Sequence, residues 1–408
     1  MSDQSTDGKG VVLRTGRVGT VELAALLTVY GSTDIFLSFP SRLAEHSAQG
    51  AFFTPLLSAV LMLAALFVVF LLQRSVAKRN WLESLDETLT PYLTMPLALA
   101  LSCYFLLQTA LNAREFSETI ITTVLPATPT SIIILLLLLT VFYYAMAGYE
   151  GLTRVSILLG GVMLVGLIVL TLLPMTWFRR ELLFPILGNG PLALAKSGFR
   201  NTGEFPQLLL IMILAATLRN HKHTLRVGIM SISFSAVIMS VVLLVFIGTF
   251  ASAVTGTVPF PMYQLARVIY VGRYVQRLES VFVFLWISAA VIKLGFGLWL
   301  TGYLYAHAFR MPLYRPLLPM FIVLIYVLAF LPPDLPTVQM LYANYFEKYS
   351  WIVTLALPVG LALIARFIQW IKSRRHRKKK RGSGKGDEES RESGTARARS
   401  GFRKGVLR

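Results

Sequence analysis

The chain has 408 residues, of which 55% are hydrophobic and only 14% are charged, and its formal net charge is +19. Soluble globular domains carry about 25% charged residues, so this much apolar surface has no aqueous core to fill. The composition excludes a soluble enzyme, a nucleic-acid-binding domain and a disulfide-rich secreted module, and it predicts an all-α polytopic membrane protein.

The chain opens with a polar stretch, residues 1–19, for which we expect a cytoplasmic position and no cleavable signal peptide. Long apolar runs follow, and a helical crossing needs about 20 residues, fewer where the helix is broken. These runs predict one transmembrane domain, residues 20–371, with ten helices. The predicted spans are 20–40, 51–73, 91–113, 131–149, 153–173, 203–218, 226–250, 278–307, 314–332 and 349–371. Residues 78–87, between the second and third spans, are expected to form a short interfacial helix.

An even number of spans places both termini on one side of the membrane. A basic run at residues 372–381 directly follows the last span, and such clusters resist translocation, so we expect both termini in the cytoplasm. The remaining tail, up to residue 408, has hardly an apolar residue and is expected to be disordered. We interpret residues 372–408 as a topology anchor that contacts anionic lipid. A docking arm for protein or nucleic acid is the less favoured alternative, and no nucleic acid is among the expected partners.

Two of the spans contain helix-breaking sequences. The first span is interrupted at Tyr30, Gly31, Ser32, Thr33 and Asp34. The sixth is interrupted at Asn201, Thr202, Gly203, Glu204, Phe205 and Pro206. Gly and Pro weaken a helix, and Ser and Thr hydroxyls can satisfy the backbone groups that are freed. If the domain consists of two repeats of five helices, residues 20–173 and 203–371, each break lies in the first helix of its repeat, which is typical of inverted-repeat binding sites.

The breaks predict a ligand site. Unwound backbone exposes N–H groups at the start of one half-helix and C=O groups at the end of the other, and these suit a carboxylate and an ammonium respectively. A zwitterionic amino acid would satisfy both. The alternative is that Gly and Pro only kink packed helices.

Three ionisable residues lie in or near spans, where a charge is costly unless it is paired or faces water. They are Asp34, Glu204 and Lys293. Lys293 could take the place of a coupling cation near the unwound carbonyls. Alternatively, it could form a structural pair with Glu204 or Asp34, or its stem could reach toward polar depth. Glu204 could instead cap a helix near a membrane face.

Other positions give weaker signals. Tyr104 in the third span and Ser288 in the eighth have the type and depth to line a pocket, although packing is the more common role for each taken alone. The single cysteine, Cys103, excludes a disulfide framework, and His221 and His223 lack carboxylate partners, so we expect no metal site. Because no nucleophile–base pair or phosphate-binding Gly loop is present, we expect neither an enzyme nor a cofactor.

Several motifs together are similar to those of one family. They are Arg114-Glu115-Phe116-Ser117-Glu118 followed by LPATP, Gly148-Tyr149-Glu150 with Arg154, FPILGNG and GEFP at the sixth span, and Gln276-Arg277-Leu278-Glu279 leading through Trp286 to Lys293. From about Arg17 to Trp370 the sequence resembles the B subunit of bacterial spore germination receptors. That family is the endospore germination permease branch of the amino acid–polyamine–organocation superfamily. The chain departs from it in having DETLTPYL, where a Gly-Lys-rich stretch is common, and in its extended basic tail.

The resemblance implies an amino-acid-transporter-like (LeuT-type) fold with broken helices 1 and 6, used as a nutrient sensor in the spore inner membrane. It implies a small germinant, an amino acid or a sugar, and two partners, a membrane-embedded A subunit and a lipoprotein C subunit. The family's pocket positions carry over most directly to Gly31, Tyr104, Ser288 and the break at Gly203–Phe205. The alternative is a proton- or sodium-coupled amino acid transporter of the cell membrane, with Glu204 or Lys293 in the coupling role. A membrane-embedded transferase is disfavoured.

Overall fold

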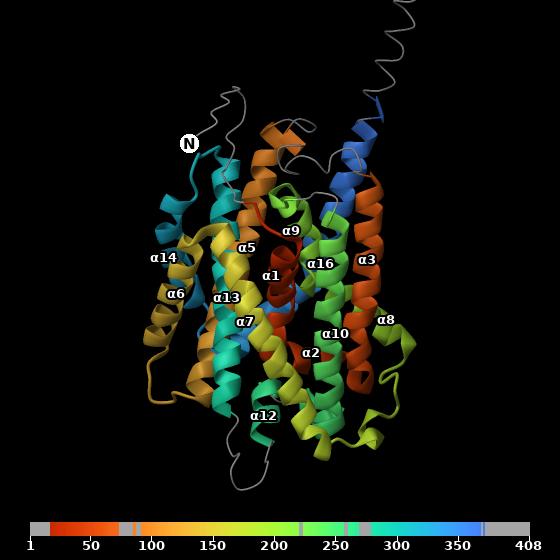
Figure 1. Cartoon of the computed structure of the whole chain (residues 1–408). Helices are drawn as coiled ribbons and strands as arrows, with labels where there is room; N and C mark the ends of the chain where they lie inside the picture. The colour runs from red at the N-terminus through yellow and green to blue at the C-terminus, as the bar shows by residue number, and fades with distance from the viewer. Residues whose placement is uncertain are drawn as a thin grey trace, which may run out of the picture. The chain divides into compact units, whose positions relative to one another are not determined.

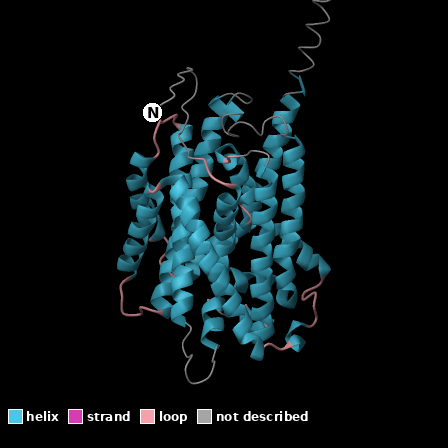
Figure 2. Ribbon diagram, viewed as in Figure 1, coloured by secondary structure: helices cyan, strands magenta, loops and turns pink. Residues whose placement is uncertain are grey.

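The structure is a computed structural model, and it describes residues 17–72, 85–86, 91–219, 223–256, 260–268, 279–368 and 370–371. Over these residues the regular secondary structure is helical, apart from one isolated bridge between Val18 and Leu218 (Figure 2). Helices dominate because a helix satisfies its own backbone groups, which lipid cannot do. The predicted all-α class is confirmed.

Several predictions concern residues outside these described ranges. The interfacial helix predicted at 78–87 lies outside the described residues except for 85–86, which are helical. The basic tail, residues 372–408, and most of the N-terminal segment also lie outside them. The chain divides into two units, residues 1–359 and 360–408, and the fold and site below belong to the first.

The α-helices of the described residues are labelled in Figure 1. They are α1 (Thr20–Ser32), α2 (Phe39–Ser47), α3 (Thr54–Leu72), α5 (Pro91–Thr123), α6 (Thr130–Met146), α7 (Gly148–Leu172), α8 (Pro191–Arg200), α9 (Gln207–Leu214), α10 (Thr224–Phe250), α11 (Ser252–Thr255), α12 (Pro261–Val268), α13 (Glu279–Ala308), α14 (Leu318–Ala329), α15 (Leu335–Leu341) and α16 (Lys348–Trp351). The 3-10 helices are η1 (Thr33–Phe36), η2 (Ala48–Phe53), η3 (Leu173–Thr176), η4 (Arg180–Leu183), η5 (Asn201–Glu204), η6 (Ala215–Thr217) and η8 (Arg315–Leu317). Two π-helices, η9 (Tyr342–Glu347) and η10 (Ile352–Ala356), flank α16.

Six helical runs of the described residues are long and apolar enough to cross a membrane. They are Phe39–Leu72, Tyr92–Thr123, Gly148–Thr176, Thr224–Phe250, Phe282–Ala308 and Leu335–Ile368. Two shorter apolar helices, Thr130–Met146 and Arg315–Ala329, fall on further predicted spans. The first and sixth predicted spans are the interrupted ones. Their regular parts, α1 with 13 residues and α9 with 8, are too short to count as membrane-spanning by length. The count of ten crossings stays a prediction.

Helix α13 packs against five other helices, α1, α5, α6, α7 and α14 (Figure 1). Of its most apolar window 72% is buried, against 33% for the window of the neighbouring α7. Trp286 and Trp299 of α13 are among the largest fully buried side chains. Lys293, midway along α13, therefore lies inside the protein and is only 3% exposed.

The turn between α6 and α7 explains one of the sequence motifs. Gly148 has a φ of +80°, a conformation that residues with a Cβ rarely adopt. The next residue, Tyr149, is buried, and its hydroxyl accepts a hydrogen bond of 3.0 Å from the Thr217 hydroxyl at the end of the sixth predicted span. The motif thus ties the α6–α7 turn to that span.

Candidate functional site

The first predicted interruption is present, slightly later in the chain than the sequence indicated. The α-helix continues through Tyr30 and Gly31 to Ser32 and then tightens into η1. Leu37 is extended, with a φ of −97° and a ψ of −158°, and α2 begins two residues later. The Ser32 and Thr33 hydroxyls donate to the carbonyls of Thr28 and Val29, at 2.7 and 2.5 Å. The Thr33 N–H donates to the Val29 carbonyl as well, so the hydroxyls bond to the last turn of α1, and their role for freed backbone groups stays a prediction.

A glutamate on α5 holds the far end of this break. Glu115, which is 1% exposed, accepts hydrogen bonds from the Ser38 backbone N–H, at 3.0 Å, and from the Ser38 hydroxyl. Arg42 of α2 donates to the same hydroxyl. The glutamate of the Arg114–Glu118 motif therefore has an identifiable role, which is to anchor the chain where the first break ends.

The second interruption lies where it was predicted. α8 passes into η5, Phe205 leaves the helical region with a ψ of 70°, and α9 begins after Pro206. Two long-range hydrogen bonds fix η5. The Thr354 hydroxyl donates to the Thr202 carbonyl, and the Asn201 amide donates to the Ser58 hydroxyl, both at 3.0 Å.

The two interrupted spans meet at Gly31. A Cβ at residue 31 would lie 1.9 Å from Nε2 of Gln207, the residue that follows Pro206. That nitrogen donates to the Ser235 hydroxyl at 3.1 Å and lies 3.5 Å from the Leu27 carbonyl oxygen. The other amide atom, Oε1 of Gln207, is buried and has no hydrogen-bond partner among the described residues. The junction therefore contains a buried hydrogen-bond acceptor, Oε1 of Gln207, that is unsatisfied among the described residues.

A buried ion pair lies next to the first break. The Lys293 ammonium of α13 contacts the Asp34 carboxylate, and the two side chains are only 3% and 5% exposed. The same ammonium lies 5.4 Å from the centroid of the Tyr30 ring, whose hydroxyl donates to Oε1 of Gln108 at 3.4 Å. Of the two partners that the sequence left open for Lys293, the contact is with Asp34.

The carboxyl group of Glu204 at the second break has different surroundings. Glu204 is buried, and it accepts a hydrogen bond of 3.2 Å from the Tyr342 hydroxyl. Over the described residues it makes no ion pair within 4 Å, although it lies within electrostatic range of Asp34, Arg42 and Lys293. Burial of Glu204 inside the protein does not fix its depth in the membrane, so its role as a helix cap near a membrane face stays a prediction.

A cluster of charged side chains around Glu347 joins the elements next to the two breaks. Glu347 of η9 contacts Arg42 of α2 at 3.2 Å, His46 of α2 at 3.5 Å and Arg200 of α8 at 3.6 Å. The Arg42 guanidinium also lies over the Tyr342 ring, 4.6 Å from its centroid. Helix α2, which follows the first break, and helix α8, which precedes the second, thus both contact the Glu347 carboxylate.

The pocket residues expected from the sequence separate into two groups. The Tyr104 hydroxyl donates to the Ser350 hydroxyl at 3.0 Å, and a Cβ at Gly203 would lie 2.8 Å from Cβ of Ser350, so Tyr104 is one residue away from the second break. Ser288 is placed differently: its hydroxyl donates to the Phe284 carbonyl of its own helix, on a partly exposed face of α13. Ser288 is therefore not brought to the breaks.

Sequence reasoning missed Gln207, Ser235 and Glu347. Gln207 had a detectable signal, since it is the only polar residue in the apolar run QLLLIMIL directly after the break. Glu347 falls between the last two predicted spans, 314–332 and 349–371, whereas the structure extends the final helical run back to Leu335. Ser235 had no signal, because a serine in an apolar helix usually bonds to its own backbone.

The arrangement defines a class of protein, a multi-pass membrane protein with the fold of secondary transporters. Two solved structures share it. The first is Mhp1, a nucleobase-cation-symport-1 family transporter in a closed conformation with bromovinylhydantoin bound (TM-score 0.60, 12% identity, 86% of this chain and 79% of that one). The second is a Na⁺-coupled sialic acid symporter in a substrate-bound outward-open state (TM-score 0.55, 14% identity, 87% and 80%). These similarities concern the fold alone.

The family follows from the sequence match. The chain belongs to the family described as spore germination protein, whose model matches residues 21–338. Two relatives come from Bacillus subtilis (strain 168). One is the putative spore germination protein YfkT, 26% identical over 65% of this chain and 72% of the relative. The other is spore germination protein KB, 25% identical over 54% of this chain and 60% of the relative. The expected family is confirmed, and neither it nor the structural neighbours are enzymes.

Proposed function

We propose that this chain is the germinant-sensing subunit of a spore germination receptor, and that it binds an amino acid or a sugar between the two interrupted spans. The observation that carries the proposal is the junction of Gly31 with Gln207 in a member of this family. A buried amide oxygen without a donor is costly, and an ammonium or hydroxyl group of a ligand would supply one. Interrupted helices are also where transporter folds expose backbone groups to their substrates.

The proposed site surrounds this junction. It comprises Tyr30, Gly31, Ser32 and Thr33 of the first span, Gly203, Glu204 and Phe205 of the sixth, and Gln207 and Tyr104. A ligand that prefers one arrangement of the breaks shifts the population of the bundle toward that arrangement. In this proposal an A subunit in the membrane and a lipoprotein C subunit respond to the shift. The protein then resides in the spore inner membrane with both termini in the cytoplasm, and its basic tail contacts anionic lipid.

Ligand binding tests the site. We expect Gly31→Ala, in the full chain in lipid nanodiscs, to weaken binding of a responsive amino acid or sugar by about tenfold, or about 1.4 kcal/mol. The added Cβ would displace the Gln207 amide. Gly161→Ala on α7 is the matched control, because a Cβ there meets nothing within 4 Å. Unchanged affinity in a monodisperse Gly31→Ala protein would remove Gly31 from the site.

The receptor role needs a second experiment. The tagged chain, recovered from the inner membrane of dormant spores, is expected to bring with it a second multi-span protein and a lipoprotein. Recovery of the chain alone, from the membrane of vegetative cells, would contradict the receptor assignment.

A second candidate function is proton- or sodium-coupled transport of the same ligand. The observation that favours it is the buried Asp34–Lys293 pair beside the first break, since ionisable pairs within a membrane often belong to ion pathways. Uptake of the ligand into proteoliposomes that depends on a pH or sodium gradient would support transport. Binding without uptake would favour the receptor.

A further inference from the structure

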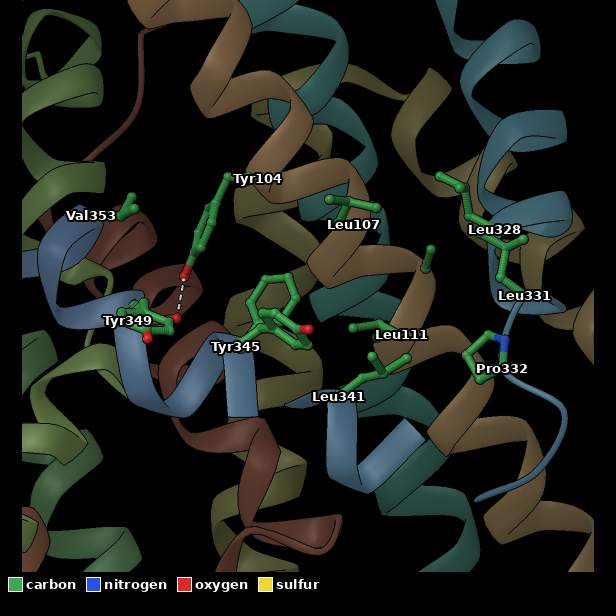
Figure 3. A pocket seen from close by; sticks show the side chains of 13 residues that line it. Tyr104, Leu107, Leu111, Leu328, Leu331, Pro332, Leu341, Tyr345, Tyr349 and Val353 are labelled. Carbon is green, nitrogen blue, oxygen red and sulfur yellow. Dashed lines mark hydrogen bonds between the residues drawn. The ribbon is translucent and has the colours of Figure 1, made fainter. Parts of the chain in front are cut away.

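A cavity of about 480 Å³ lies beside the second break, between α5, the end of α14 and the helical run from α15 to η10 (Figure 3). Its size falls in the range of about 300–1,000 Å³ that is usual for small-ligand pockets. Leu107 and Leu111 of α5 form one wall, Leu331 forms a second, and Tyr345 and Tyr349 form a third.

The lining is apolar and aromatic, and none of the residues that form it is charged. Two of the lining hydroxyls, those of Tyr104 and Ser350, are hydrogen-bonded to each other at 3.0 Å (dashed line in Figure 3). A zwitterion placed here would leave both of its charges without a partner, and a buried unpaired charge is very costly. The cavity therefore suits an apolar occupant.

The surroundings of the cavity supply such an occupant. Two of its walls belong to runs that are long and apolar enough to cross a membrane, Tyr92–Thr123 and Leu335–Ile368. Leu331, Tyr345 and Tyr349 are 70%, 63% and 49% exposed, so the cavity opens at the outer surface of the bundle, beside these two apolar runs. Apolar cavities stay dry, and empty space costs their lining its dispersion contacts. Acyl chains are the apolar molecules that surround helical runs of this kind in a membrane.

Both π-helices contribute to the cavity. Tyr345 and Phe346 belong to η9, and Val353 belongs to η10. π-helical turns are rare and occur frequently at functional sites. Here they lie on either side of Ser350, which contacts Tyr104 at the cavity and packs against Gly203 at the second break.

We propose that this cavity binds an acyl chain of a membrane lipid, which supports Ser350 against the second break. The proposal does not depend on which small ligand the breaks bind, or on whether that ligand is transported. It adds a lipid site that is reached from within the membrane and is separated from the second break only by Ser350.

Photolabelling in nanodiscs tests the lipid site. The probe is phosphatidylcholine with a diazirine in its acyl chain, and labelled peptides of the full chain are mapped by mass spectrometry. We expect peptides that contain Leu107–Leu111 and Leu341–Val353 to be labelled more strongly than α6, whose exposed leucines sample lipid at random. Labelling that is no stronger than that of α6 would overturn the proposal.

Filling the cavity gives the second arm of this test. Leu111→Trp is expected to lower labelling of the cavity peptides by about tenfold, because the indole occupies the space of the acyl chain. Ala110→Phe, also from the lining, repeats the test if the first variant does not fold. Leu139→Trp, at a position of α6 that is 52% exposed, is the matched control. Labelling that either folded variant leaves unchanged, or that a free amino acid or sugar abolishes in the wild type, would overturn the lipid assignment.

Discussion

The two interruptions of the bundle use the same device but are held in different ways. At the first break, side chains fill the space around Gly31, and the nearby carboxylate of Asp34 is paired with the Lys293 ammonium. At the second break, Gly203 packs against the backbone and Cβ of α16, and the carboxyl group of Glu204 receives only a neutral hydroxyl within hydrogen-bond distance among the described residues.

This difference separates adaptable contacts from rigid ones. An amide and an ion pair can exchange partners when a ligand arrives, whereas helix backbone cannot move without its neighbours. We therefore expect the first break to respond to a ligand and the second to transmit the response through α16. The predictions below test this division, from the largest expected effect to the smallest.

Lys293→Met is expected to have the largest effect. It leaves the buried Asp34 carboxylate without its ion-pair partner, and breaking a buried pair in this way costs about 3–5 kcal/mol. Thermal unfolding of the protein in nanodiscs measures the loss. The double variant Asp34→Asn/Lys293→Met should recover most of it, since neither charge remains. Lys196→Met, at an exposed position of α8, serves as the control.

The same variant tests ion coupling, provided that it folds. If Lys293 holds the place of a coupling cation, Lys293→Met must alter the pH or sodium dependence of ligand binding or transport. Dependences identical to those of the wild type would reduce the pair to a structural role.

The two glycines give the next contrast. Gly203→Ala places a Cβ 2.8 Å from Cβ of Ser350 and 3.2 Å from the Trp351 nitrogen, and overpacking of this kind costs about 1–3 kcal/mol. Ser350→Gly should relieve it only in part, because the backbone contact remains. Gly31→Ala should instead be relieved by Gln207→Ala, since its closest contact is that side chain. Equal rescue at both positions, in double-mutant cycles of thermal stability, would contradict the proposed division.

Tyr342→Phe is expected to have the smallest effect. It removes the hydroxyl that donates to Glu204, and a hydrogen bond of this kind contributes about 1 kcal/mol. Tyr345→Phe is the matched control, because that ring is 63% exposed. A loss of stability as large as that of Lys293→Met would mean that Glu204 is held as an ion rather than as a hydrogen-bonded carboxyl group.

Much of the fold could be predicted from the sequence because the membrane leaves few solutions. Apolar runs of sufficient length must be helical, and Gly, Pro, Ser and Thr within such a run mark the places where the helix is interrupted. The break at Asn201–Pro206 was located to the residue for this reason, whereas the first was expected at Tyr30–Asp34 and begins at Thr33. An α-helix tolerates a single glycine, as α1 does at Gly31, so the local sequence does not show at which residue the helix ends.

The pairing of side chains across the bundle was decided only by the tertiary structure. The sequence marked Lys293 and Asp34 as costly charges but could not choose between Asp34 and Glu204 as the partner, because they lie on different spans. It gave Tyr104 and Ser288 similar weight, although one faces the second break and the other bonds to its own helix. Composition and local pattern thus determine that this chain spans the membrane with two broken helices. Which groups meet at the breaks depends on helix rotation and packing, and these are set by contacts between residues far apart in the chain.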